Sequence, residues 1–176
     1  MAVHSSREKL VALLQLAHAG ERAATLAYEG HWRSSSSASE RDAIRAIQQE
    51  EIEHRACVGR MLAQLGARPA PIRERLMAAI GGTLGALCHV SGWLLPMLGA
   101  AVLETRNVKE YDDAAALASD SGEHALVPEL QHMANVELEH ELWFKERVRS
   151  HRLGRLLPLQ PTTRGAQASG FRVDAG

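Results

Sequence analysis

The stretch 44–65, which reads IRAIQQEEIEHRACVGRMLAQL, decides the fold class of this chain. Its apolar residues return every three or four positions, which is the period of one face of an α-helix. Two polar residues, Glu51 and His54, fall within that apolar stripe instead of on the opposite face. Both side chains are therefore predicted to point into the core of a helical protein. The complete stripe is Ile44, Ile47, Glu51, His54, Val58, Met61 and Leu65.

Helical periodicity continues over most of the chain. Few aromatic residues and many Ala, Leu, Glu and Arg also favour helix over strand. Stretches rich in Ser, Gly or Pro separate the periodic segments and are typical of turns. Helices are predicted at about 6–32, 38–65, 72–90, 94–118 and 122–153.

A chain of 176 residues is long enough for one domain with a single core. We expect an all-α four-helix bundle over residues 1–157, built from two helical hairpins. The apolar segment between the hairpins is predicted to be an additional crossover helix. Residues 158–176, rich in Thr, Gly, Gln and Ser, are predicted to form a disordered tail.

In three further predicted helices a glutamate interrupts the apolar stripe. These residues are Glu21 in the first helix, Glu104 in the fourth and Glu137 in the last, where His140 follows one turn later. Residues equidistant from a hairpin turn lie side by side in antiparallel helices. Glu21 and the Glu-x-x-His pair of the second helix are centred near residue 37, inside a serine loop. The later set is centred near residue 121, inside a second turn, so all these side chains are predicted at one level of the bundle.

Such a set of side chains suits two metal ions. One Glu from each of two helices plus Glu-x-x-His from each of two others is the ligand set of di-iron and di-manganese bundles. Four carboxylates would cancel the charge of two divalent ions, whereas four buried glutamates without metal would be costly or protonated. Oxygen and nitrogen ligands accept both iron and manganese, so the choice of metal stays open. The predicted ligands are Glu21, Glu51, His54, Glu104, Glu137 and His140.

Three other residues, His18, Tyr28 and Tyr111, lie near the predicted ligands and are candidates for supporting roles. His18 would either support a ligand or be a hydrogen-bonded histidine at the edge of the core. For the two tyrosines, ordinary core packing is the favoured interpretation. Solvated helix faces account for Glu50, Glu53, Glu139 and Glu141.

Composition limits the partners and the compartment. Twenty basic residues nearly balance 21 acidic ones and form no basic block, which argues against nucleic acid as a partner. Two isolated cysteines, Cys57 and Cys88, make no disulfide framework and favour a reducing compartment. The first ten residues lack the apolar segment of a secretory signal, so we expect a cytoplasmic protein.

Residues 76–103 contain no Asp, Glu, Lys or Arg. The part from Leu84 to Leu103 has three interpretations: a core crossover helix, a membrane span, or an apolar surface that rests on a membrane. Its glycines and Pro96 disfavour an uninterrupted span, while Trp93 suits a membrane interface. Location at the inner face of the cell membrane therefore stays open, as does assembly into a homo-oligomer.

With the ligands placed, the chain resembles the ferritin-like di-iron carboxylate superfamily and, within it, the demethoxyubiquinone hydroxylase family. The likeness covers about 18–147. It implies two iron ions, with Glu21 and Glu104 as terminal ligands, Glu51 and Glu137 as bridging ligands, and one histidine on each iron. The matching motifs are HAGE at 18–21, Glu51-x-x-His54 with Arg68-Pro69 after it, IGGTLGAL at 80–87, AVLE at 101–104 with Tyr111, and ELEH at 137–140.

This resemblance implies a monooxygenase that uses O2 to hydroxylate the ring of a prenylated quinol precursor in ubiquinone biosynthesis. Its partners would be O2 and a hydrophobic quinone-like substrate. The alternative is a ferritin-like ferroxidase or peroxide-scavenging iron protein. A di-iron hydroxylase of modified RNA fits the ligands but not the missing basic patch, and a purely structural bundle is the remaining class.

Overall fold

The structure is a computed structural model that describes residues 2–157 and 159–162. Every regular element within these residues is helical, so the predicted all-α class is confirmed. All five predicted helices are present. They are α1 (Ala2–Ser34), α2 (Ala38–Gln64), α3 (Pro71–Cys88), α4 (Leu94–Asp120) and α5 (Val127–Ser150), with short 3-10 turns at His124–Leu126 and Gly154–Leu156.

The connection between α4 and α5 is longer than the sequence pattern indicated. Gly122 follows α4 with a φ of 81°, a left-handed conformation that glycine adopts without steric cost. A 3-10 turn comes next, and Pro128 occupies the first turn of α5. Because proline suits a helix start, α5 begins at Val127 and not near residue 122.

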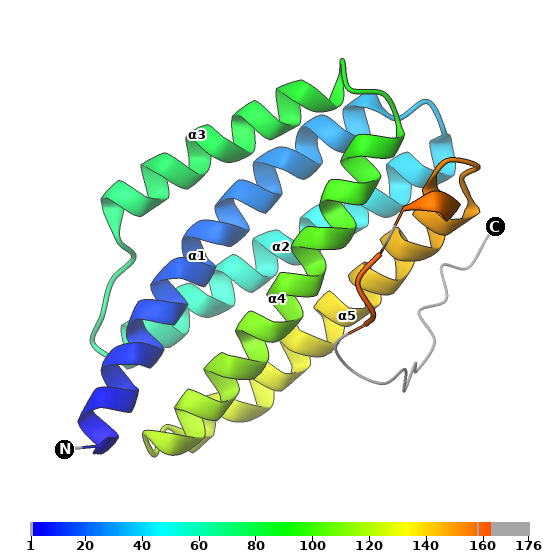
Figure 1. Cartoon of the computed structure of the whole chain (residues 1–176). Helices are drawn as coiled ribbons and strands as arrows, with labels where there is room; N and C mark the ends of the chain where they lie inside the picture. Colours follow the sequence, from blue (N-terminus) through cyan, green and yellow to red (C-terminus); the bar gives the residue numbers. More distant parts are fainter. Residues whose placement is uncertain (1, 158, 163–176) are drawn as a thin grey trace.

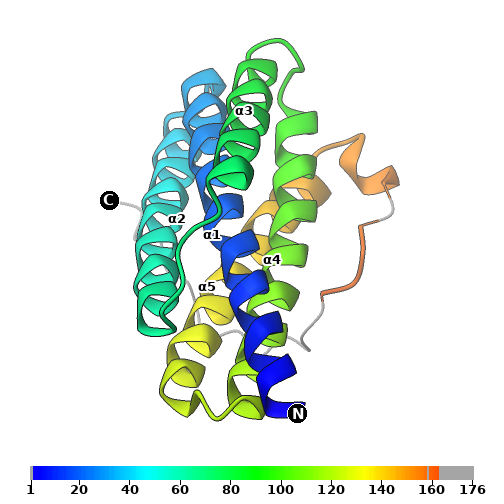
Figure 2. The same ribbon diagram turned by 90° about the vertical axis from the view of Figure 1, so that its left-hand side faces the viewer.

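Two helical hairpins, α1 with α2 and α4 with α5, form the bundle (Figure 1). The first hairpin turns at the serine loop, where the Ser37 side chain accepts a hydrogen bond from the Glu40 N–H at 3.4 Å and caps α2. Figures 1 and 2 both show α3 outside these four helices and alongside α1. The predicted arrangement of two hairpins with a crossover helix is therefore confirmed.

Glycines bring α3 close to α1. A Cβ atom added at Gly81 would lie 2.3 Å from the carbonyl oxygen of Ala23, and one added at Gly30 would lie 2.1 Å from that of Gly85. No side chain fits at either point, so the two backbones can touch only because these residues are glycines. Glu74 adds a polar contact, since its carboxylate accepts from Arg55 on α2 at 2.8 Å.

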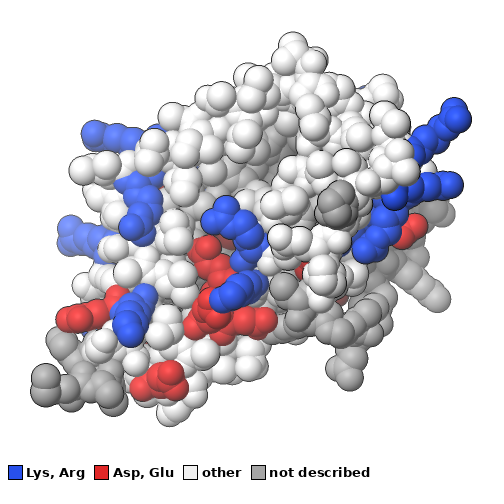
Figure 3. Space-filling model, in the orientation of Figure 1, with Lys and Arg blue, Asp and Glu red and all other residues white. Residues whose placement is uncertain are grey.

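The outer face of α3 has no protein partner within the described residues. Its large apolar side chains recur along one side of the helix and are exposed, and the exposed apolar surface continues to Leu95 and Val102 on α4. In Figure 3 the surface over the end of α3 and the start of α4 carries no Lys, Arg, Asp or Glu. We call this surface the apolar face; on α3 it comprises Ile72, Leu76, Ile80, Leu84 and Leu87.

Two apolar clusters fill the bundle. One contains Leu10, Leu14 and Met61, and the other contains Ile44 and Phe144. The buried glutamates and histidines of the predicted site belong to neither cluster. The core thus consists of two apolar clusters and a separate set of buried glutamates and histidines, which we call the polar level.

None of the helices in the described part of the chain combines the length and hydropathy needed to cross a bilayer. Most of the predicted disordered tail, at 158 and 163–176, lies outside the described residues. Residues 159–162 are described, and there Leu159 packs against the Phe144 cluster. The Gln160 carbonyl accepts a hydrogen bond from Lys145 at 2.8 Å.

Candidate metal centre

The structure brings all six predicted ligands together at the polar level of the bundle. They form two groups of four, and in each group one oxygen or nitrogen atom from every residue lies within 4.8 Å of those from the other three. Glu51 and Glu137 belong to both groups, which is the position that bridging ligands would need. The first group is Glu21, Glu51, His54 and Glu137, and the second is Glu51, Glu104, Glu137 and His140.

Each histidine faces the shared glutamate of the other hairpin. His54 Nδ1 is hydrogen-bonded to Glu137 Oε1 at 2.9 Å. His140 Nδ1 lies 3.3 Å from Glu51 Oε1 without the geometry of a hydrogen bond. The two hairpins therefore meet through their Glu-x-x-His pairs, and neither pair forms a complete group alone.

The two tyrosines also connect across the bundle. The Tyr111 hydroxyl donates to Glu21, and the Tyr28 hydroxyl donates to Glu104. The sequence interpretation favoured packing alone for both residues, but the structure places each phenol on a carboxylate of the site. A signal for this was available, because each tyrosine follows the single glutamate of its own helix by seven residues, or two helical turns.

Two polar side chains that were not predicted to support the site do so. Glu50 Oε2 lies 2.6 Å from His140 Nε2, the ring nitrogen opposite the one that faces Glu51 and Glu137. A carboxylate on the outer nitrogen of a histidine ligand fixes its orientation. Asn107 donates to Glu104 at 3.1 Å and to Glu137 at 3.4 Å. Glu50 is partly exposed, as its predicted place on a solvated helix face requires, and it also contacts His140, which the sequence interpretation did not foresee.

Glu141 is a second correction, because it is buried and not solvated. Its carboxylate accepts from Lys145, which is also buried, and from the Thr105 hydroxyl at 3.0 Å. The spacing of four residues resembles an ordinary surface ion pair on a helix, so the sequence carried no sign of the burial.

His18 lies outside the cluster of six. Its Nδ1 is 2.7 Å from Glu74 Oε1, in a buried contact between α1 and α3. Of the two roles considered for it, the structure therefore matches the hydrogen-bonded histidine at the core edge.

The electrostatics indicate a site that needs positive charge. Burial and the neighbouring shared glutamates raise the pKa values of Glu21 and Glu104 well above the ordinary range. Burial also opposes ionisation of Glu137, but the hydrogen bond to His54 and the nearby ring of His140, whose Nδ1 lies 3.8 Å from Glu137 Oε2, hold the pKa of Glu137 below the usual value. Four carboxylates at this depth can all be ionised only with compensating cations.

The donor set fits two metal ions. Within the described residues, both Glu51 oxygens, Glu21 Oε2 and His140 Nδ1 are buried without a hydrogen-bond partner. Buried polar atoms rarely remain unpaired, and four of the six such side-chain atoms in the described residues belong to the clustered residues; the other two are Arg55 Nε and Glu141 Oε2. The oxygen and nitrogen chemistry of the clustered residues suits iron or manganese.

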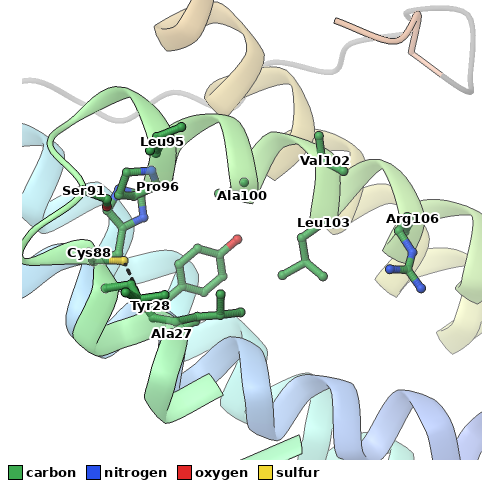
Figure 4. Close-up of a pocket in the computed structure, with 14 residues that line it drawn as sticks. Ala27, Tyr28, Cys88, Ser91, Leu95, Pro96, Ala100, Val102, Leu103 and Arg106 are labelled. Atoms are coloured by element: carbon green, nitrogen blue, oxygen red, sulfur yellow. Dashed lines mark hydrogen bonds between the residues drawn. The ribbon is translucent and has the colours of Figure 1, made fainter. Parts of the chain in front are cut away.

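An apolar cavity of about 470 Å³ adjoins the site between α1, α3 and α4 (Figure 4). Tyr28 lines it and links it to the site through the hydrogen bond to Glu104. Figure 4 shows Leu103 and Arg106 along the α4 side of this cavity. The opposite wall comes from α3, near the apolar face, so the cavity lies between this apolar surface and Tyr28, which bonds Glu104.

Comparisons with known proteins agree with this arrangement. The chain is 27% identical over 143 residues to the 3-demethoxyubiquinol 3-hydroxylase of Chromobacterium violaceum. The aligned region covers 78% of this chain and 68% of the relative. No solved structure gives a significant match.

A family model, described as ubiquinone biosynthesis protein COQ7, matches residues 8–115. That segment runs from α1 into α4 and contains Glu21, Glu51, His54 and Glu104. Glu137 and His140 lie beyond it, so α5 is assigned to the site by the geometry of this chain. Because the match covers more than half of the chain, the protein belongs to the family of the ubiquinone biosynthesis protein COQ7.

Proposed function

We propose that this protein is a di-iron monooxygenase that hydroxylates the ring of a prenylated quinol with O2. The observation that carries the proposal is that one residue, Tyr28, belongs both to the cavity wall and to the hydrogen bonds of the site. Tyr28 lines an apolar cavity and donates its hydroxyl to Glu104 of the predicted metal centre. A ring held in the cavity would therefore lie beside the clustered carboxylates. Family membership and the name of the Chromobacterium violaceum relative support the same function.

Iron bound by the six residues would supply the reduction of O2. The overall reaction converts a ring C–H bond into C–OH and forms one water, with two protons and two electrons from an external reductant. Glu21 and Glu104 would each hold one ion, while Glu51 and Glu137 would be shared. His54 would serve one ion and His140 the other.

The remaining side chains hold these ligands in place. Tyr28 and Asn107 donate to Glu104, and Tyr111 donates to Glu21, so the single glutamates stay oriented toward the centre. Glu50 fixes the ring of His140. The apolar walls of the cavity would exclude water from the reacting ring.

We further propose that the apolar face rests on a membrane surface, from which a prenylated substrate enters the cavity. Leu84 and Leu87 belong both to the exposed face and to the cavity wall. An apolar tail could thus pass from lipid to the site without crossing water. Large exposed apolar patches are typical of such interaction surfaces.

The decisive experiment is a single-turnover assay. Anaerobic protein is loaded with Fe(II) and exposed to O2 with and without a short-tailed demethoxyquinol, and the quinone is analysed by mass spectrometry. We expect the gain of one oxygen atom, lost in Glu21→Gln and retained in the matched control Glu29→Gln on the exposed side of α1. Repeated iron oxidation by O2 or peroxide with no oxygen in the quinone would instead favour an iron-handling protein.

A further inference from the structure

His31 is a buried polar residue in the wall of the apolar cavity. It lies on α1, one turn after Tyr28, and only 5% of its surface is exposed. Within the described residues no hydrogen bond reaches either ring nitrogen, although the backbone carbonyl of His31 accepts from Ser34. The ring nitrogens are not among the fully enclosed unpaired atoms of the described residues, so they remain accessible, and an occupant of the cavity could hydrogen-bond them in place of water.

The other polar side chains in the cavity wall either form hydrogen bonds within the protein or are less buried than His31, as Ser91 and Arg106 are. Tyr28 donates its hydroxyl to Glu104, and the Cys88 thiol donates to the Leu84 carbonyl. Arg106 is exposed, at the end of the cavity away from Ser91 (Figure 4). Of the lining residues, His31 is therefore the buried one that still has hydrogen-bonding capacity to offer.

Stacking fixes the orientation of the imidazole. The His31 and Phe144 rings have centroids 6.0 Å apart and an interplanar angle of 19°. Phe144 also stacks on Tyr28, at 5.7 Å and 5°, so the same ring supports both residues. A polar group held by its neighbours can position a ligand with little loss of its own conformational freedom.

The charge state of His31 limits the chemistry of the occupant. Burial lowers its pKa to about 4, so the ring is neutral at neutral pH. A neutral imidazole offers one donor and one acceptor. It therefore suits a hydroxyl or carbonyl group and gives no advantage to an anion.

We infer that His31 hydrogen-bonds an oxygen substituent of the substrate ring and thereby orients that ring beside Tyr28. This inference rests on the proposed function, and it makes His31 a specificity-determining residue. A ring that lacks the oxygen would leave the imidazole unpaired. Sites built to hydrogen-bond a substrate group discriminate against analogues without it.

The test compares two probes in metal-free protein. One is a 1,4-benzoquinol with a ten-carbon alkyl tail, and the other is the alkylbenzene with the same tail. We expect His31→Phe to lower the ratio of quinol affinity to alkylbenzene affinity by roughly two- to tenfold, which corresponds to one neutral hydrogen bond. His31→Gln, which keeps a donor and an acceptor, should retain most of the ratio. Leu103→Ala, a matched change in the apolar wall, should weaken both probes and leave the ratio unchanged.

Nitrogen-15 NMR of labelled histidine gives a direct readout in the wild type. The His31 ring nitrogens should shift when the quinol binds and should not shift with the alkylbenzene. An unchanged affinity ratio in folded His31→Phe, or an unperturbed His31 resonance, would overturn the inference. Quinol hydroxylation by the iron-loaded wild type separates the two proposals. If oxygen is transferred while the ratio is unchanged, only the role of His31 fails; if none is transferred, the proposed function fails.

Discussion

The two hairpins of the bundle carry the same pattern of predicted ligands but support it differently. Each has a single glutamate, a tyrosine seven residues later and a Glu-x-x-His pair. In the α4–α5 hairpin, Asn107 lies one turn after Glu104 and bonds it, whereas Ala24 occupies the equivalent position after Glu21. Accordingly, Glu21 Oε2 is buried without a partner in the described structure, while both Glu104 oxygens are hydrogen-bonded.

The two hairpins also differ at the residue that follows the histidine of each Glu-x-x-His pair. After His54 comes Arg55, which bonds Glu74 and so ties α2 to α3. After His140 comes Glu141, which is buried with Lys145. The α1–α2 hairpin therefore uses this position to bind the crossover helix α3, whereas the α4–α5 hairpin uses it for a buried ion pair between its own residues. The pattern shared by the two hairpins determines the predicted ligands, and the residues around each hairpin determine which hydrogen bonds hold those ligands in place.

The largest expected effect distinguishes the shared ligands from the single ones. Glu137 belongs to both groups and Glu21 to one. We expect Glu137→Ala to bind less than one ion per chain after anaerobic Fe(II) loading, whereas Glu21→Ala keeps one ion in the second group. Metal analysis after desalting measures both. The control Glu146→Gln, on the exposed side of α5, should bind two ions like the wild type. Two tightly held ions in Glu137→Ala would contradict the shared assignment.

The second prediction concerns the buried pair that only the α4–α5 hairpin has. Lys145→Met would leave the Glu141 carboxylate buried without its cation, and such changes cost about 3–5 kcal/mol of unfolding free energy. Denaturant unfolding of metal-free protein gives the value. The double variant Glu141→Gln with Lys145→Met removes both charges and should recover most of the loss. Arg55→Met is the matched change in the other hairpin, and it should cost less because Arg55 is partly exposed and Glu74 keeps His18. Equal losses in the two hairpins would refute the proposed asymmetry.

These residues also show how far the sequence predicts the molecule. Apolar periodicity and distance from the turns are local properties, and they sufficed for five helices and for the six side chains that meet. Their role as metal ligands stays a prediction. The burial of Glu141 and Lys145 could not be read from the sequence, since it depends on Thr105 from α4 and on residues 159–162 folding back to offer the Gln160 carbonyl. The uncommitted ring of His31 likewise depends on where α3 leaves a cavity.

The smallest expected effect separates the two tyrosines. Tyr111→Phe removes the one side-chain hydrogen bond shown for Glu21, whereas Glu104 keeps Asn107 when Tyr28 is changed to Phe. Outer hydrogen bonds of this kind typically contribute 10- to 100-fold to metal affinity. We expect Tyr111→Phe to weaken Fe(II) or Mn(II) binding by about tenfold and Tyr28→Phe by several-fold less, measured by competition with a chelator. The double variant Tyr28→Phe with Asn107→Ala removes both side-chain hydrogen bonds to Glu104. It should therefore weaken metal binding about as much as Tyr111→Phe does. If Tyr28→Phe alone already matches Tyr111→Phe, Asn107 gives no support and the two hairpins hold their glutamates equally.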